Sequence, residues 1–289
     1  MRVIPLCGLL LEHLPLFQTD MPTLKKPVQS IAIKPAVVTS AVTGTQAIRR
    51  AGAILRAIAK AGVTGTSLAE IARAEVLSRT TTHRILRCLV EEGFVEFTPD
   101  NKRYQMGHLI HELGLTSASS AAEVGRWREV VEAISRAAGV TCYLMRRSGI
   151  EAVCLLKADS HSVMRFVPVE VGQRRLLGVG AGAAALLAAL DPKRIDQVIT
   201  AIAPSLAAFP RINPETLHAG VELTQRTGFA ISQGTVVADG FGMGIALPGS
   251  NGPPHLAISI AAHASLVSES TITAWKKIMR DAIASARSG

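Results

Sequence analysis

The apolar positions in the first helical region of the chain recur at three- and four-residue spacing, the period of an amphipathic helix. A first helix is predicted to begin near Thr45. Ser67 and Glu70 have the spacing of a capping box, in which the serine accepts from a helix N–H and the glutamate reaches back. They predict the start of a short second helix. Ser78 is typical of the N-cap of a third helix, which we expect to run to about Glu92.

The third helix is followed by two short segments, 94–97 and 103–106, in which residue types alternate as in strands. The residues between them, 98–102, include proline, aspartate and asparagine, which favour a turn. Three helices followed by a small β-hairpin predict a winged helix-turn-helix over residues 44–107.

The rest of the chain alternates between strand and helix patterns. We expect a linker helix over residues 108–121 and an α+β domain over residues 122–289. Its expected strands cover residues 140–147, 152–157, 166–171, 229–237, 244–247 and 256–262. Its expected helices cover residues 121–138, 178–190, a segment opened by Asp191 and Pro192, 213–227 and 272–286.

Residues 1–43 hold five prolines and no sustained period, so we expect a flexible extension, with Met21 as an alternative start. The longest apolar run, residues 179–190, is shorter than the roughly 18 residues that a membrane span needs. The four cysteines form no C-x2-C pair, which argues against a zinc ribbon, and we expect a cytoplasmic protein. We expect no catalytic residue, no metal and no cofactor.

The chain carries 31 Lys+Arg against 22 Asp+Glu, a formal net charge of +9 that is spread along its length. Such a charge is compatible with a nucleic-acid partner and equally with a basic surface that only keeps the protein soluble. Placement is more informative than the total. On a helical wheel, the inner face of the third helix carries Thr82, Ile85, Leu86, Leu89 and Val90.

The outer face of the third helix carries arginines and threonines, which suit a helix in the DNA major groove. Arginine bonds guanine in bidentate fashion, and threonine contacts bases or phosphate. A solvated polar face is the alternative. Together with the hairpin turn, the candidate DNA-contacting residues are Arg79, Thr80, Thr81, Arg84, Arg87, Lys102 and Arg103.

In these segments the sequence resembles the IclR (isocitrate-lyase-regulator) family of bacterial transcription factors. The resemblance rests on the order and spacing of residues 45–59, 67–72, 80–86, 89–94 and 103–107, and continues more loosely to the end of the chain. It implies a winged helix-turn-helix, a linker helix and a GAF-like effector-binding domain. It also implies a homodimer or dimer of dimers that represses or activates at a partly palindromic operator in double-stranded DNA.

Two departures from the family pattern stand out. The turn of the helix-turn-helix usually has leucine and glycine where this chain has Glu75 and Val76. Valine at a position that often needs positive φ is strained, so we expect a different turn, with consequences for DNA affinity or docking angle. The family's ligand pocket has an aspartate where this chain has Ser232, and its second serine is Ala261 here.

The resemblance maps the remaining pocket positions to the loop at Ala181 and Gly182, to Ser259, and to Gly242 or Met243 in place of a cysteine. Backbone N–H groups near Gly180 at a helix start suit a carboxylate. The candidate ligand-binding residues are Gly180, Ala181, Gly182, Ser232, Met243 and Ser259. We expect a small organic carboxylate with a larger apolar body, such as an aromatic acid; the alternative is a pocket that binds nothing.

Two other motifs admit a different interpretation. Glycines at 178, 180 and 182 invite a dinucleotide site, but residues 173–175 make a poor strand core ahead of them. His108 and His111 share a helix face without further ligands, which favours a solvated linker helix. The alternative function is a cytosolic metabolite-binding protein or enzyme whose helix-turn-helix module serves assembly.

Overall fold

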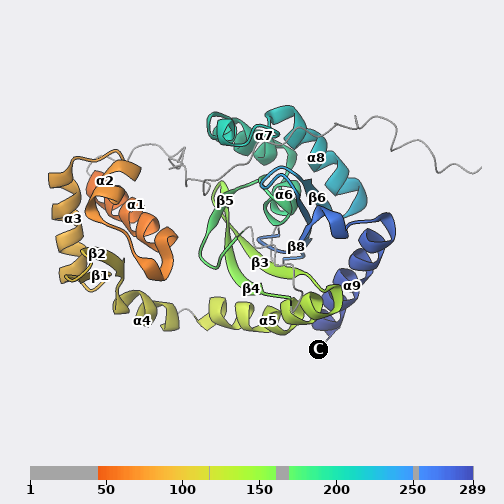
Figure 1. Cartoon of the computed structure of the whole chain (residues 1–289), viewed down its shortest axis with the longest axis horizontal. Coiled ribbons are helices and arrows are strands. Elements are labelled where there is room, and N and C mark those ends of the chain that lie inside the picture. The colour runs from red at the N-terminus through yellow and green to blue at the C-terminus, as the bar shows by residue number, and fades with distance from the viewer. Residues whose placement is uncertain (1–44, 117, 161–168, 250–253, 289) are drawn as a thin grey trace, which may run out of the picture. The chain divides into compact units, whose positions relative to one another are not determined.

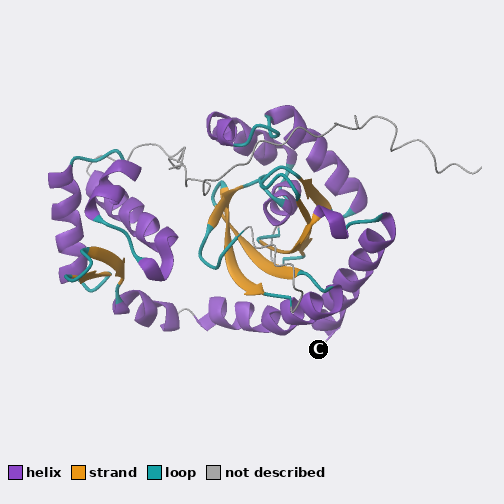
Figure 2. Ribbon diagram, in the orientation of Figure 1, coloured by secondary structure: helices purple, strands orange, loops and turns teal. Residues whose placement is uncertain are grey.

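The computed structural model describes residues 45–116, 118–160, 169–249 and 254–288 (Figure 1). The expected extension over residues 1–43 lies outside these ranges. Within them the chain forms an N-terminal helical unit with a small hairpin and a C-terminal unit of sheet and helices (Figure 2). The predicted fold class is confirmed.

The N-terminal unit contains the three expected helices, α1 (Gln46–Ala61), α2 (Leu68–Ala74) and α3 (Arg79–Glu91). A short 3-10 turn, Gly62–Thr64, was not expected. The wing is an antiparallel hairpin of β1 (Val95–Thr98) and β2 (Arg103–Met106). The core side chains come from the three helices and the two strands and are Ile54, Ile58, Ile71, Leu86, Leu89, Val95 and Tyr104.

The expected helix caps are present. The side chain of Ser67 accepts from the amide of Glu70, and the Glu70 carboxylate accepts from the Ser67 amide at 2.8 Å. Ser78 caps α3 by accepting from the amide of Thr81 at 3.1 Å. Thr82 is fully buried on the inner face of α3 and donates its hydroxyl to the carbonyl of Ser78. Val90, which the helical wheel also assigned to the inner face of α3, is exposed.

The turn between α2 and α3 keeps a left-handed residue in spite of its sequence. Val76 has φ of +53° and is 75% exposed, and Leu77 then bonds back to the Ala72 carbonyl. The expectation of a different turn is therefore wrong. The helix-turn-helix holds this backbone conformation with a valine where glycine would adopt it without strain.

The C-terminal unit is built on a curled six-stranded sheet in the order β5-β4-β3-β8-β7-β6, with every neighbouring pair antiparallel. The strands are β3 (Thr141–Ser148), β4 (Glu151–Ala158), β5 (Arg174–Leu176), β6 (Ala230–Gln233), β7 (Gly240–Leu247) and β8 (Leu256–His263). Two helices precede the sheet along the chain, α4 (His108–Thr116) and α5 (Ala118–Ala138).

Helices cover both faces of this sheet. One core forms between the sheet and α5 with α9 (Glu269–Ser288), which lie side by side in Figure 1. The other core lies between the sheet and α6 (Ala181–Ala188), α7 (Pro192–Ile202) and α8 (Pro214–Thr227). No helix in the described part of the chain is long and apolar enough to cross a bilayer.

Several strand boundaries differ from those expected. The strand expected over residues 166–171 lies partly outside the described ranges, and residues 169–171 are not in a strand. Instead, Arg174–Leu176 forms edge strand β5, although its arginines made it look like a poor strand core. β6 ends at Gln233, and β7 begins at Gly240, ahead of the expected 244–247.

Candidate DNA-binding surface and ligand pocket

The N-terminal half of α3 presents the polar surface that the helical wheel predicts. Arg79, Thr80 and Arg84 are exposed. Within the described residues, no hydrogen bond or ion pair ties the side chains of Arg79 and Arg84 to another side chain. These guanidinium groups are therefore available to an incoming partner.

Thr81 has a local task in addition to any contact with a partner. It is half-buried, and its hydroxyl accepts from Ser78 Oγ at 2.9 Å. Its amide donates to the same Ser78 oxygen. Ser78 and Thr81 thus fix the first turn of α3.

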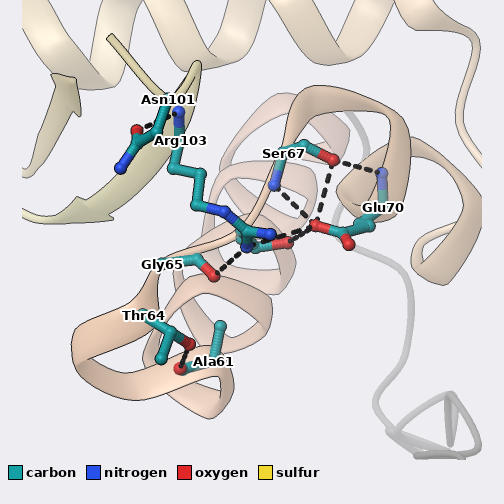
Figure 3. Close-up of polar contacts among 8 residues, drawn as sticks. Ala61, Thr64, Gly65, Ser67, Glu70, Asn101 and Arg103 are labelled. Atoms are coloured by element: carbon teal, nitrogen blue, oxygen red, sulfur yellow. Dashed lines mark hydrogen bonds and ion pairs between the residues drawn. The ribbon is translucent and has the colours of Figure 1, made fainter. Parts of the chain in front are cut away.

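Two of the predicted contact arginines already have partners. Arg87 Nε donates to Glu91 Oε1 at 2.8 Å, with both side chains largely exposed. Arg103 Nη1 donates to the Gly65 carbonyl at 2.9 Å and lies 3.8 Å from Glu70 (Figure 3). Arg103 thereby joins the wing to the segment before α2.

Lys102 lies at the tip of the wing. It is exposed and has φ of +54°. The amide of the next residue donates to Asn101 Oδ1 at 3.0 Å, which closes the turn (Figure 3). Of the two basic wing residues, Lys102 is the one that extends into solvent.

The capping box near the wing has an electrostatic signature. Two hydrogen bonds hold the pKa of Glu70 below its ordinary value: the one from the Ser67 amide has the larger effect, and the one from the Ser67 hydroxyl comes second. Hydrogen bonds to the ionised form favour that form. Glu70 is therefore a carboxylate that serves both the α2 start and Arg103.

The C-terminal unit contains a pocket between the start of α6 and the sheet. Its empty space, which includes the open mouth, is about 570 Å³. Five of the six candidate ligand residues line it: Gly180, Ala181, Gly182, Ser232 and Ser259.

Met243 does not line the pocket. It is fully buried in the core on the α5 and α9 side of the sheet, whereas its neighbour Gly242 lines the pocket. Successive strand residues point to opposite faces, so a shift of one residue reverses the assignment. Of the two positions that the resemblance left open, Gly242 is the pocket residue, and Met243 as a ligand residue is wrong.

The first turn of α6 lies unusually close to the strands. A Cβ built on Gly182 would lie 2.7 Å from Met145 Cγ and 2.8 Å from Ser259 Oγ. A Cβ on Gly244 would lie 2.5 Å from the Ala181 carbonyl oxygen. Glycine at these positions lets the helix start approach the pocket floor.

The amides of Ala181, Gly182 and Ala183 have no acceptor among the described residues, and Gly180 provides no side-chain cap. Along α6, the first amide with an acceptor is that of Ala184, which donates to the Gly180 carbonyl. Unpaired amides at a helix start carry partial positive charge. The pocket thus has a backbone surface suited to an anion.

Two pocket residues were missed in the sequence. Arg175 of β5 lines the pocket, as does Tyr143 of β3. Burial lowers the pKa of Arg175, an effect that nearby Tyr143 partly opposes. Burial also raises the pKa of Tyr143, so its hydroxyl stays protonated. An arginine on a short strand resembles a surface charge, and a tyrosine in an apolar strand resembles core, so neither carries a sequence signal.

Two family profiles match the chain, and together they span most of it. The IclR helix-turn-helix domain matches residues 47–99, and the C-terminal domain of the bacterial transcriptional regulator IclR matches residues 118–287. The glycerol operon regulatory protein of Streptomyces coelicolor is 29% identical over 194 residues, covering 64% of this chain and 72% of that protein.

Solved structures share the fold. An IclR transcriptional regulator from Alicyclobacillus acidocaldarius is 20% identical with a TM-score of 0.68, covering 83% of this chain and 96% of its own. An IclR homologue from Microbacterium hydrocarbonoxydans, in complex with 4-hydroxybenzoate, is 20% identical with a TM-score of 0.66, covering 84% of this chain and 100% of its own.

Proposed function

The chain belongs to the IclR family of bacterial transcriptional regulators, and from this premise we propose that a small organic ligand in its C-terminal pocket changes the affinity of its N-terminal domain for an operator. Family members and the curated relatives are regulators and not enzymes, so the enzyme alternative is set aside. We propose double-stranded DNA as the partner and the cytoplasm as the site of action.

The observation that carries the DNA proposal is the exposed N-terminal half of α3. An α-helix fits the major groove, where arginine donates to guanine O6 and N7. Arg79, Thr80 and Arg84 are exposed there, and the exposed Lys102 on the wing has the charge that a contact to the phosphate backbone requires. We assign base contact first to Arg84, because Arg87 is paired with Glu91 and Arg103 with Gly65.

A homodimer or a dimer of dimers is part of the proposal. Two-fold symmetry would present two copies of α3 to successive major grooves, about 34–36 Å apart along the duplex. A partly palindromic operator with half-sites about 10 base pairs apart is the expected target.

The proposed effector is a carboxylate with an apolar body, such as an aromatic acid. The pocket walls are mainly apolar, and the free amides at the start of α6 suit the acid group. The 4-hydroxybenzoate in the Microbacterium hydrocarbonoxydans homologue supports this class. A carboxylate bound here is the expected modulator of DNA affinity.

The test begins with genomic fragments selected by binding to the full-length protein. Fluorescence anisotropy then measures the affinity of a selected fragment for the unmodified protein, for Arg84→Ala and for a matched control, Arg226→Ala. Arg226 is an exposed arginine in the last turn of α8, so the control removes the same charge from the C-terminal unit. Arg84→Ala is expected to weaken binding by about 1–3 kcal/mol and to relax base preference at one position.

Salt dependence gives an independent readout. Phosphate contacts release counterions, so the affinity of every variant should fall as salt rises. Equal affinity and equal sequence preference for Arg84→Ala and Arg226→Ala would remove Arg84 from base recognition. Absence of any selected fragment would overturn the DNA proposal itself.

A further inference from the structure

The buried hydroxyl of Tyr143 has no explained role in the fold. Tyr143 is 3% exposed, and its hydroxyl oxygen has no hydrogen-bond partner among the described residues. A buried polar group without a partner costs free energy, and each such group calls for an explanation. Because Tyr143 lines the pocket, a ligand would supply the missing partner.

Tyr143 lies beside the start of α6. It pairs in register with Ser259 on the adjacent strand β8. The side chain of Ser259 in turn lies against Gly182, where an added Cβ would come within 2.8 Å of Ser259 Oγ. The tyrosine and the unpaired amides of the helix start thus belong to one small region of the pocket wall.

Arg175 adds the charge that this region needs. Among the described residues that line the pocket, it is the one charged side chain. A guanidinium carries five N–H donors in a planar fork that matches a carboxylate. Burial disfavours its charged form, and a bound anion would offset that penalty.

The neighbouring acids do not oppose an anion with their full charge. Asp159 and Glu170 both act on Tyr143 electrostatically, but both are paired with Lys157, at 3.4 Å and 2.9 Å. A single cation in the pocket lining matches a single negative charge on the ligand. The walls beyond it are apolar, with Val179, Val236 and Ile260 among them.

We propose that Tyr143 and Arg175 together bind the acid group of the effector and select a monocarboxylate over its neutral isostere and over a dicarboxylate. The inference rests on the proposed function, because it names the ligand class of the same pocket. Arg175 supplies the charge, the Tyr143 hydroxyl donates to a carboxylate oxygen, and the apolar walls receive the body of the ligand.

Isothermal titration calorimetry of the full-length protein tests the selection with three probes: benzoate, benzamide and terephthalate. Benzoate is expected to bind at least about tenfold more tightly than the other two. Benzamide has no charge for Arg175 to pair with, and the second carboxylate of terephthalate would lie against the apolar walls. Equal binding of benzamide and benzoate, or tighter binding of terephthalate, overturns the proposal. So does the absence of binding by all three.

Variants test the two residues. Tyr143→Phe is expected to weaken benzoate binding about 10- to 100-fold, the loss of one charge-assisted hydrogen bond. Arg175→Met should weaken it at least as much, and Arg175→Lys should restore part of the loss. The matched control is Arg147→Met. Arg147 pairs with Ala152, which in turn pairs with Arg175, so the control removes a cation from the same row of the sheet but outside the pocket lining. The benzoate affinity of this variant should stay within about twofold of that of the unmodified protein.

The melting temperature of the ligand-free protein separates binding from folding. The Tyr143 hydroxyl has no partner in the described structure, so Tyr143→Phe should leave this temperature unchanged or raise it. A lowered melting temperature would show that the hydroxyl stabilises the fold, and unchanged benzoate affinity would show that it does not bind the acid. Either result overturns its assigned role.

DNA titrations of the same proteins with and without benzoate separate this inference from the proposed function. If the variants keep benzoate affinity while benzoate still changes DNA affinity, the inference fails and the function stands. If the variants lose benzoate while benzoate never alters DNA affinity, the inference stands and ligand control of DNA binding fails.

Discussion

The valine in the helix-turn-helix turn offers a sharp test of how the structure is stabilised. Val76 has φ of +53°, and such a conformation for a β-branched residue costs on the order of 1–3 kcal/mol. Val76→Gly removes this strain. The variant also loses the burial of the one quarter of the valine side chain that is covered, which costs roughly 0.4–0.8 kcal/mol of stability. Glycine makes the unfolded chain more flexible, which costs roughly 0.5–1 kcal/mol more.

The balance favours the variant by about 0.5–1 kcal/mol, the middle of these ranges. Hydrogen exchange measured by mass spectrometry on peptides that span α2 and the turn is the suitable assay. The protected amides there include Glu75, which donates to Ile71, and Leu77, which donates to Ala72. Their exchange is expected to slow about two- to fivefold.

Val63→Gly is the matched control for this experiment. Val63 is 92% exposed in the turn Gly62–Thr64, and positive φ among the described non-glycine residues is confined to Val76 and Lys102. Glycine at Val63 therefore relieves nothing and adds unfolded-state entropy, so exchange of the surrounding amides should be unchanged or faster. Exchange in Val76→Gly that is equally fast or faster would refute the strain argument. Operator affinity of Val76→Gly should stay within about twofold, because the turn keeps its geometry.

Three further predictions concern other parts of the chain. Ser67→Ala should destabilise the N-terminal unit by about 1 kcal/mol, measured by hydrogen exchange. Because the pKa of Glu70 is lowered in the folded chain, the contribution of Glu70 to stability is present above the ordinary glutamate pKa and is lost as the pH falls through the lowered value. Glu70→Gln should remove that pH dependence. Met243→Ala should cost about 2–5 kcal/mol in tryptophan-detected denaturation, since Trp127 and Trp275 share its core, while benzoate affinity is retained. Gly182→Ala should destabilise the C-terminal unit by about 1–3 kcal/mol through contact with Met145 and Ser259. Gly220→Ala in α8, where a Cβ meets nothing within 4 Å, should stabilise that unit slightly.

The N-terminal unit was predictable because its signals are local. The caps at Ser67 and Ser78 act on amides three residues away, and the burial of Thr82, Leu86 and Leu89 follows from helical spacing alone. The partners of the arginines were not predictable in the same way. The bond from Arg103 to Gly65 joins residues far apart in the sequence, and it depends on how the wing folds back.

The sheet of the C-terminal unit was harder to predict where packing overrides local preference. β7 begins with glycines at 240, 242 and 244, which are poor strand formers. They are accommodated because Ala181 of α6 packs directly against Gly242 and Gly244. β5 contains Arg174 and Arg175, and only the pairing with β4 reveals it as a strand.

The pocket was predictable in outline and not in its polar chemistry. The glycine-rich entry to α6 located the pocket, and Ser232 and Ser259 do line it. Met243 was misassigned because a one-residue uncertainty in register exchanges the two faces of a strand. Tyr143 comes from β3, which is distant in sequence from α6, and Arg175 comes from β5, which was not predicted as a strand. The two side chains therefore meet at the pocket only in the folded chain.

The central claim, that the exposed half of α3 reads DNA bases, is tested most directly by protection of guanine N7 from methylation on a selected fragment. N7 faces the major groove, so the unmodified protein should protect guanines in each half-site. Arg84→Ala should lose protection at one guanine per half-site and keep the rest. An identical protection pattern for the two proteins, or no N7 protection at all, would contradict the claim.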